Sequence, residues 1–459
     1  MTDPTPVLSE RIARHMAGVR FEDLPSSTVT AAKHILLDAT GVMLAASGMA
    51  EEAAPFIRLA SEAGAGPSTI LGTGLKASPA AAAFANGSLA HALDFEDAFD
   101  LAPGHPNASL VPALLALAQL RAPADGKQFL TALAAGGDLS CRVGLALRRR
   151  MEEGGWYPPP ITAGIGAACG AGRLLGLSAE GVLDCLSLAL CQVTMPGEIM
   201  HSRRTVLRAV REAFPAQAAV QSALLAEAGV AGFETPVEGK GGFYKLYAGG
   251  QFEPADLLDG LGERYWIERL TFKRWPSCRG THPFIQMALR LHSSGVAAEA
   301  ISRVTVLIDP VQKMLVEPAD RKQAPAVVID AKFSIPFTTA LALVRGKVTL
   351  DEFDPAVLRD ADVFGTARKI SYEVVEAPSW QFGSGGGIRV ELADGQVFED
   401  SVHNASGCPD DPLSEDHLRE KFIDCATRAR VPLSRDRAAQ LADAILSLET
   451  CDDVGALFA

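Results

Sequence analysis

Residues 91–105 hold the first group of side chains that could do chemistry. The segment opens with His91, Asp94, a glutamate and Asp97, and a second histidine, His105, follows between a glycine and a proline. Acids and imidazoles at this density are sufficient for general acid–base catalysis. If the first part is helical, His91, Asp94 and Asp97 share one face. The alternative is that the two aspartates only hydrogen-bond the local backbone.

His105 directly precedes an apolar stretch that predicts a helix. A loop at this position can direct an imidazole into a cleft, and the positive end of the helix lowers the pKa of a nearby histidine. We therefore expect His105 to act as an acid or a base.

A second group lies in residues 273–283, which read Lys-Arg-Trp-Pro-Ser-Cys-Arg-Gly-Thr-His-Pro. Proline and glycine keep such a segment irregular. Because an arginine offers two parallel donors to a carboxylate, the cations here predict a carboxylate-binding site. A surface position for Lys273 is the alternative. Cys278 is a weaker candidate for a nucleophile, since most lone cysteines behave as small core residues.

Composition limits the class of protein. With 48% hydrophobic and 21% charged residues, the chain is typical of a packed globular protein. The net charge of -13 argues against nucleic acid or an anionic membrane as a partner. The eight cysteines form no CxxC pair and lie beside no histidine at ligand spacing, so we predict neither a metal site nor another cofactor. We find no signal peptide or membrane span and expect a soluble cytoplasmic protein.

The hydrophobic pattern changes along the chain. Apolar residues at helical spacing dominate up to about residue 268, and an alanine- and glycine-rich stretch at 161–174 predicts a buried helix with close neighbours. Further helices are predicted at 28–46, 109–120, 127–149, 210–228, 334–345, 349–359, 414–428 and 434–448. Alternating β-branched residues predict strands at 304–308, 370–375 and 387–392.

This pattern predicts a mainly α fold in two domains. A chain of 459 residues exceeds the usual size of a single core. We expect a large all-helical domain formed by residues 1–268 plus 405–459, and a smaller α+β domain inserted at 269–404.

The two groups belong to a series of motifs that resembles the MmgE/PrpD family. The motifs are His91-Ala-Leu-Asp94-Phe-Glu-Asp, His105-Pro, Glu238-Gly-Lys-Gly-Gly-Phe243, Lys273-Arg-Trp-Pro-Ser-Cys278 and Asp330-Ala-Lys-Phe-Ser-Ile-Pro-Phe337. They occur in the family's order, and the resemblance runs from about Val7 to Leu457.

The resemblance implies a fold and a chemistry. Members have a large helical domain, an inserted smaller domain, a homodimeric assembly and a metal-independent site between the domains. They include 2-methylcitrate dehydratase, cis-aconitate decarboxylase and iminodisuccinate epimerase, which all handle a carbanion next to a carboxylate. By position, Asp94, His105 and Lys273 match residues of the family's active site. Cys278 occupies the place where decarboxylase-like members carry a histidine.

Some positions depart from the family pattern. The motif threonine is Ala98, a motif histidine is Tyr157, and a block that usually holds lysine and histidine reads 208–217 with neither. The lysine's role would fall to Arg211 or Arg208, or be lost. Because arginine stays protonated, it can hold a carboxylate but is a poor proton shuttle. This weakens the expectation of a decarboxylase most, and that of a standard methylcitrate dehydratase to a lesser degree.

The sequence therefore predicts a metal-independent hydro-lyase that acts on a small polycarboxylate such as a 2-methylcitrate-like acid. His105 and Tyr157 are the expected acid–base pair, with Asp94 orienting His105. The expected substrate-binding residues are Arg208, Arg211, Lys273, Cys278, Arg279 and His282. An epimerase or racemase, a decarboxylase, and a decayed non-catalytic member remain alternatives.

Overall fold

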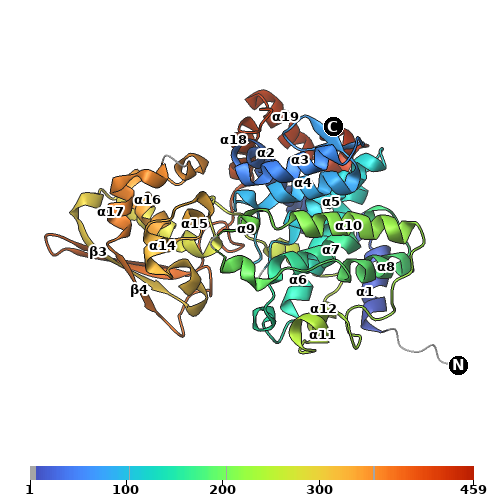
Figure 1. The fold of residues 1–459 in the computed structure, drawn as a ribbon, viewed down its shortest axis with the longest axis horizontal. Helices are drawn as coiled ribbons and strands as arrows, with labels where there is room; N and C mark the ends of the chain where they lie inside the picture. Colours follow the sequence, from blue (N-terminus) through green and yellow to red (C-terminus); the bar gives the residue numbers. More distant parts are fainter. Residues whose placement is uncertain (1–6, 103, 203, 355–356) are drawn as a thin grey trace. The chain divides into compact units, whose positions relative to one another are not determined.

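The structure is a computed structural model that describes residues 7–102, 104–202, 204–354 and 357–459. The described chain is mainly α-helical, with small sheets, which confirms the mainly α part of the predicted fold class. It divides into two compact units (Figure 1). The helical unit comprises Met1–Ala92, Glu96–Leu270 and Ser414–Ala459, and the α+β unit comprises Leu93–Phe95 and Thr271–Leu413.

The helical unit is a bundle of packed helices. Its α-helices are α1 (Leu8–Gly18), α2 (Ser26–Met49), α3 (Ala54–Glu62), α4 (Pro79–Ala92), α5 (Pro106–Leu120), α6 (Gly126–Leu145), α7 (Pro158–Leu174), α8 (Ala179–Leu190), α9 (Leu207–Val210), α10 (Ala213–Glu227), α11 (Phe243–Ala248), α12 (Pro254–Leu258), α18 (Glu415–Thr427), α19 (Arg435–Leu446) and α20 (Val454–Leu457). A short hairpin, β1 (Ser68–Ile70) and β2 (Leu75–Ala77), lies between α3 and α4.

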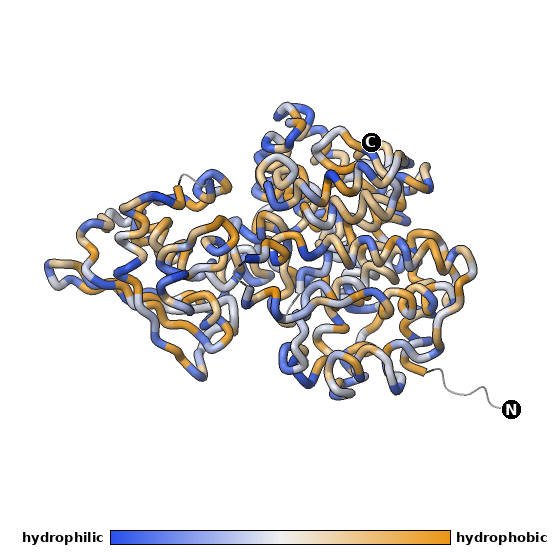
Figure 2. The backbone as a smooth tube through the Cα atoms, viewed as in Figure 1, coloured by the Kyte–Doolittle hydropathy of each residue, from blue (hydrophilic) through white to orange (hydrophobic). Residues whose placement is uncertain are grey.

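Small residues let the central helices approach closely. Helix α7 is buried over most of its length, as its composition predicts, and it packs against α5, α6 and α10. A side chain at Gly166 would place its Cβ 2.2 Å from the backbone oxygen of Gly136 on α6. The central helices α4, α5, α7 and α10 are coloured mainly for hydrophobic residues in Figure 2. These helices form the core that supports the residues at the ends of α4 and α5.

Helix α2 is the one helix in the described ranges that is long and apolar enough to cross a membrane. Most of its apolar window, 72%, is buried, and the helix packs against α4 and α18. This burial is that of a core helix and is consistent with a soluble protein.

The α+β unit is built on a four-stranded sheet in the order β4-β3-β5-β6. The strands are β3 (Ile301–Ile308), β4 (Ile370–Val374), β5 (Gly386–Leu392) and β6 (Val397–Val402). Strands β3 and β4 are parallel, and the other pairs are antiparallel. The α-helices of this unit are α13 (His282–Ser293), α14 (Ala319–Gln323), α15 (Val328–Lys332), α16 (Ile335–Arg345) and α17 (Ala361–Ala367).

Three predictions of local structure need correction. The hairpin of β1 and β2 interrupts a region predicted to be helical throughout. The helix predicted at 349–359 is wrong, because the described part of that segment forms two short 3-10 turns, Leu350–Phe353 and Val357–Arg359. Pro355, which cannot donate a backbone hydrogen bond, lies outside the described residues. Helix α6 ends at Leu145 instead of 149, since Arg148 donates its backbone N–H to Gln251.

Candidate active site

The segment between α4 and α5 contains a sharp turn at Asp94. Helix α4 ends at Ala92, and Asp94 adopts a left-handed conformation with φ of 50°. For a residue other than glycine this conformation is uncommon and persists only where the surroundings fix it. The expectation that His91, Asp94 and Asp97 share a helix face is therefore wrong. Because of this turn, the neighbouring acidic side chains point in directions that a continuous helix would not give them.

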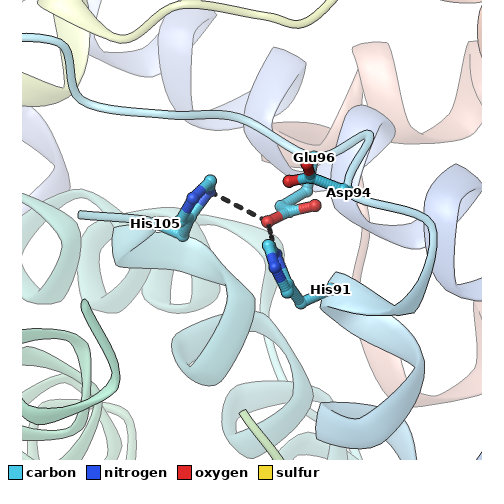
Figure 3. Close-up of side chains that lie close together, drawn as sticks. All are labelled: His91, Asp94, Glu96 and His105. Carbon is cyan, nitrogen blue, oxygen red and sulfur yellow. Dashed lines mark hydrogen bonds and ion pairs between the residues drawn. The ribbon is translucent and has the colours of Figure 1, made fainter. Parts of the chain in front are cut away.

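In the helical unit, Glu96 joins two histidines (Figure 3). One carboxylate oxygen, Oε1, pairs with Nδ1 of His91, which ends α4, and lies 2.9 Å from Nδ1 of His105, which caps α5. Glu96 and His91 are completely buried, whereas the His105 side chain is 16% exposed. Of these three groups, His105 is thus the one that solvent or a ligand can reach.

The contacts of His105 define its tautomer. Its Nδ1 lies 2.9 Å from the backbone oxygen of Asp97 and 2.9 Å from Oε1 of Glu96. Both oxygens are acceptors, so Nδ1 carries the proton and donates it. In the neutral imidazole this leaves the lone pair on Nε2. The arrangement matches that of a general base oriented by a carboxylate.

Arg211 extends this network. Its guanidinium is fully buried, with Nε donating to Glu212 at 3.1 Å and Nη2 lying 3.4 Å from Nδ1 of His91. It also lies over the ring of Tyr157, 5.2 Å from the centroid, as in a cation–π contact. Arg208 is half-buried on α9, and its backbone oxygen accepts from Arg211. The helical unit therefore brings His105, Tyr157 and Arg211 into one continuous set of contacts.

Burial also raises the pKa of two carboxyl groups in this unit. Burial raises the pKa of Glu212, although the Arg211 charge and a hydrogen bond from Ser109 act in the opposite direction. Burial and the charge of Asp38 raise the pKa of Asp97 to about 7. Asp97 accepts a hydrogen bond from Asn107 at 2.9 Å.

The Asp97 shift predicts a pH dependence of stability. Because the folded protein binds this proton more tightly than the unfolded chain, the stabilisation is complete below the ordinary aspartate pKa of 3.8 and is lost as the pH rises through the folded-state pKa of about 7. Asp97→Asn removes this loss. The free energy of unfolding, measured with urea, is compared between the variant and the unmodified protein. The difference in favour of the variant should be roughly 2–3 kcal/mol larger at pH 8 than at pH 5. An equal difference at both pH values would mean that Asp97 ionises normally.

The α+β unit holds a buried ion pair, between Lys273 and Asp94. Lys273 is completely buried, and its Nζ lies 2.5 Å from Oδ1 and 3.0 Å from the backbone oxygen of Asp94. The surface alternative for Lys273 is therefore wrong. Holding both the side chain and the backbone of Asp94, Lys273 contributes to the left-handed turn at this residue.

Lys332 fixes the residue before Asp94. This lysine lies in the Asp-Ala-Lys-Phe-Ser motif, is 1% exposed, and donates to the backbone oxygens of Leu93 and Pro276, both at 2.8 Å. Its Nζ also lies 4.3 Å from the ring centroid of Phe353. Lys332 thus ties the Leu93–Phe95 segment to the loop that follows Lys273.

The other residues of this unit that were predicted to bind substrate mainly contact other protein groups. Arg279 donates to Asn404 at 2.7 Å and to the backbone oxygen of Ala405 at 2.6 Å. His282 is completely buried, and burial, followed by the charges of Arg279 and Lys273, holds its pKa well below the usual range. His282 is therefore uncharged, and its contacts are with other groups of the protein. Cys278 is partly exposed, and its backbone N–H bonds to Lys332.

The histidines and Glu96 also have the side-chain types of a metal site. Ligand atoms of His91, Glu96 and His105 lie within 4.8 Å of one another, and Asp94, also labelled in Figure 3, belongs to the α+β unit. A metal needs a lone pair on each nitrogen ligand. The Nδ1 of His105 instead points at the Asp97 carbonyl, which requires a proton there. Nδ1 of His105 is therefore a proton donor in the described geometry and not a metal ligand.

Two functional candidates were missed in the sequence. Glu96 was counted among the acids of the first group without a role, and only the structure pairs it with both histidines. Lys332 lies in a motif quoted for the resemblance, and no local pattern indicates that it contacts Leu93, 239 positions away. The one sequence signal for Lys332 is that this lysine stands in an otherwise apolar segment.

Known proteins match the chain over nearly its whole length. The model of the MmgE/PrpD N-terminal domain matches residues 10–255, and that of the MmgE/PrpD C-terminal domain matches residues 275–448. The cis-aconitate decarboxylase-like protein oryM of Aspergillus oryzae is 27% identical over 490 aligned positions, covering 100% of this chain and 98% of that protein.

Two further relatives are enzymes whose names give different reactions, a decarboxylation and a dehydration. Cis-aconitate decarboxylase of Homo sapiens is 25% identical and covers 98% of this chain and 93% of its own. 2-Methylcitrate dehydratase of Escherichia coli is 25% identical over a shorter alignment, 72% of this chain and 71% of its own. Both family models together span most of the sequence. The chain therefore belongs to the MmgE/PrpD family.

Proposed function

We propose that this protein is a cytoplasmic lyase that removes or adds water at the carbon next to a carboxylate of a small polycarboxylate, in the manner of a hydro-lyase. The observation that carries the proposal is the environment of His105: Nδ1 donates to the Asp97 carbonyl and lies 2.9 Å from the Glu96 carboxylate, so Nε2 is a base on the one partly exposed member of the cluster. The relatives named as a dehydratase and as decarboxylases support the substrate class.

Each step has a candidate group. Nε2 of His105 removes the α-proton, and the buried Glu96 carboxylate stabilises the imidazolium that forms. The cations Arg211 and Lys273 stabilise the substrate carboxylate as it gains enolate character, a contribution on the order of 3 kcal/mol for each well-placed donor. Tyr157 donates the proton that the leaving hydroxyl needs. The chemistry needs no metal, and we expect a homodimer, as is common for soluble enzymes.

Decarboxylation is the second candidate, favoured by the full-length similarity to cis-aconitate decarboxylases. The residue type at position 211 favours elimination instead. A buried arginine paired with Glu212 remains protonated, so it can hold a carboxylate but cannot deliver a proton to a carbanion. Epimerisation needs only removal and return of the α-proton, so Tyr157 could serve it from the opposite face.

One assay in D₂O separates these reactions. The purified protein, with and without EDTA, is incubated with 2-methylcitrate, citrate or cis-aconitate, and carbon–carbon double bonds, CO₂ and deuterium incorporation are followed. We expect water elimination or addition without CO₂ and without an effect of EDTA. CO₂ release would identify a decarboxylase, and deuterium exchange alone an epimerase. In His105→Gln, turnover should fall about 100-fold or more while substrate binding persists; loss of binding with unchanged turnover per bound substrate would contradict the role of His105.

A further inference from the structure

The α+β unit contains a cavity that none of the candidate active-site residues line. Its volume is about 370 Å³, and residues of β3, β4, α14 and the start of α16, elements labelled in Figure 1, line it. This volume is in the range of sites that bind small molecules. Strand β4, which contributes to the lining, is an edge strand of the sheet.

The charges at this cavity are all positive. Arg303, Arg368 and Lys369 line it, and no aspartate or glutamate does, although the chain as a whole has a net charge of -13. Within the described part of the chain, the guanidinium groups of Arg303 and Arg368 make no hydrogen bond or ion pair with protein. Lys369 donates to the backbone oxygen of Ile301 at 2.6 Å, which holds its charge in place.

Two acidic residues close to lining residues, Glu391 and Glu317, have other partners. Glu391 is the cross-strand neighbour of Arg303 on β5, but its carboxylate pairs with Arg389 at 3.5 Å. Glu317 accepts a hydrogen bond from the hydroxyl of Tyr372 and pairs with Lys313 at 3.7 Å. Neither of these two carboxylates lines the cavity, and within the described residues neither pairs with Arg303, Arg368 or Lys369.

The rest of the lining is apolar with a few hydroxyls and amides. Val306, Val316, Ala319, Pro336 and Ile370 form its apolar part. Gln323 donates to the Ile370 backbone at 3.1 Å and so joins α14 to β4. A wall of this kind accommodates a short carbon skeleton, while the guanidinium groups pair with its anionic oxygens.

We propose that this cavity is a second ligand site, which binds a small organic anion with two or more carboxylate or phosphate groups on a short carbon skeleton. Arg303 and Arg368 provide the two-pronged contacts, and Lys369 adds a fixed charge. The proposal concerns residues outside the catalytic assignment and does not depend on the reaction that the enzyme performs.

Calorimetric titration tests the proposal with two probes, citrate for a polycarboxylate and phosphoenolpyruvate for an organic phosphate. We expect at least one of them to bind the unmodified protein, and the double variant Arg303→Gln/Arg368→Gln to weaken that binding tenfold or more. Which probe responds identifies the anionic group. Arg389→Gln is the matched control, because it removes an exposed arginine of the same sheet that is paired with Glu391 and Glu399; it should bind as the unmodified protein does.

Citrate could also bind at the catalytic residues, so the double variant is assayed for turnover as well. Unchanged turnover together with loss of one binding event supports a separate site. Wild-type affinity for both probes in the double variant, or no binding of either probe to the unmodified protein at millimolar concentration, would overturn the proposal. Matching urea unfolding curves for the double variant and the control ensure that a loss of binding does not reflect unfolding.

Discussion

Replacing Glu96 with glutamine is expected to lower kcat by about 100- to 10,000-fold, with a smaller effect on substrate binding. The substitution preserves the size of the side chain but removes the charge that stabilises the imidazolium of His105. The new amide can also donate where the carboxylate only accepts, which disfavours the tautomer with the proton on Nδ1. The pH profile of kcat/KM provides the second measurement, because the apparent pKa of the catalytic base should fall when the carboxylate is neutralised.

A suitable control is Glu238→Gln. Glu238 is another glutamate of the helical unit, which accepts hydrogen bonds from Ser9 and makes no contact with either histidine within the described ranges. It should leave kcat and its pH profile nearly unchanged. If Glu96→Gln affected only the free energy of unfolding, and kcat and the pH profile matched those of the control, Glu96 would be a structural residue and the relay would be misassigned.

Lys273→Met is expected to abolish measurable turnover and to destabilise the α+β unit by about 3–5 kcal/mol. The ammonium group is completely buried and pairs with Asp94 at 2.5 Å, so its removal leaves a buried carboxylate without its cation. The free energy of unfolding from urea titration measures the structural part. Turnover measured on the protein that remains folded gives the catalytic part.

A double-mutant cycle separates these two contributions. Asp94→Asn in the Lys273→Met background removes the unpaired charge and should restore part of the stability, while turnover stays absent because the cation is still missing. Lys347→Met is the matched control, since this exposed lysine of the same unit also pairs with a carboxylate, Glu352. Recovery of turnover in the double variant would show that Lys273 serves only to neutralise Asp94.

The buried environment of Lys273 follows from contacts that lie far apart in the sequence. Its partner Asp94 is 179 positions away, and Leu93, the residue before Asp94, is held by Lys332, which is 239 positions from Leu93. Family motifs nevertheless drew attention to Asp94 and Lys273, because each motif has an unusual local composition. Their pairing was not readable, since side chains separated by more than one hundred residues meet only through the fold.

Local patterns predicted the elements with a clear period. Helices such as α5 and α7 and strands such as β3 were found because their apolar residues recur at one spacing over several turns or residues. The predicted helix at 349–359 was wrong, since a proline in its centre outweighs the amphipathic pattern. The hairpin of β1 and β2 was missed because strands of three residues are too short to show a period.

The sequence alone determined the family, the mainly α composition and the position of His105 immediately before an apolar helix. These features are encoded in short motifs, in hydrophobic periodicity and in a Gly-His-Pro segment, all of which act locally. Only the tertiary structure decided that Glu96 joins both histidines, that Arg211 lies over Tyr157 and that Arg303 and Arg368 line a cavity. The physical reason is that partner choice and burial, which set the charge and reactivity of these groups, depend on packing between distant segments.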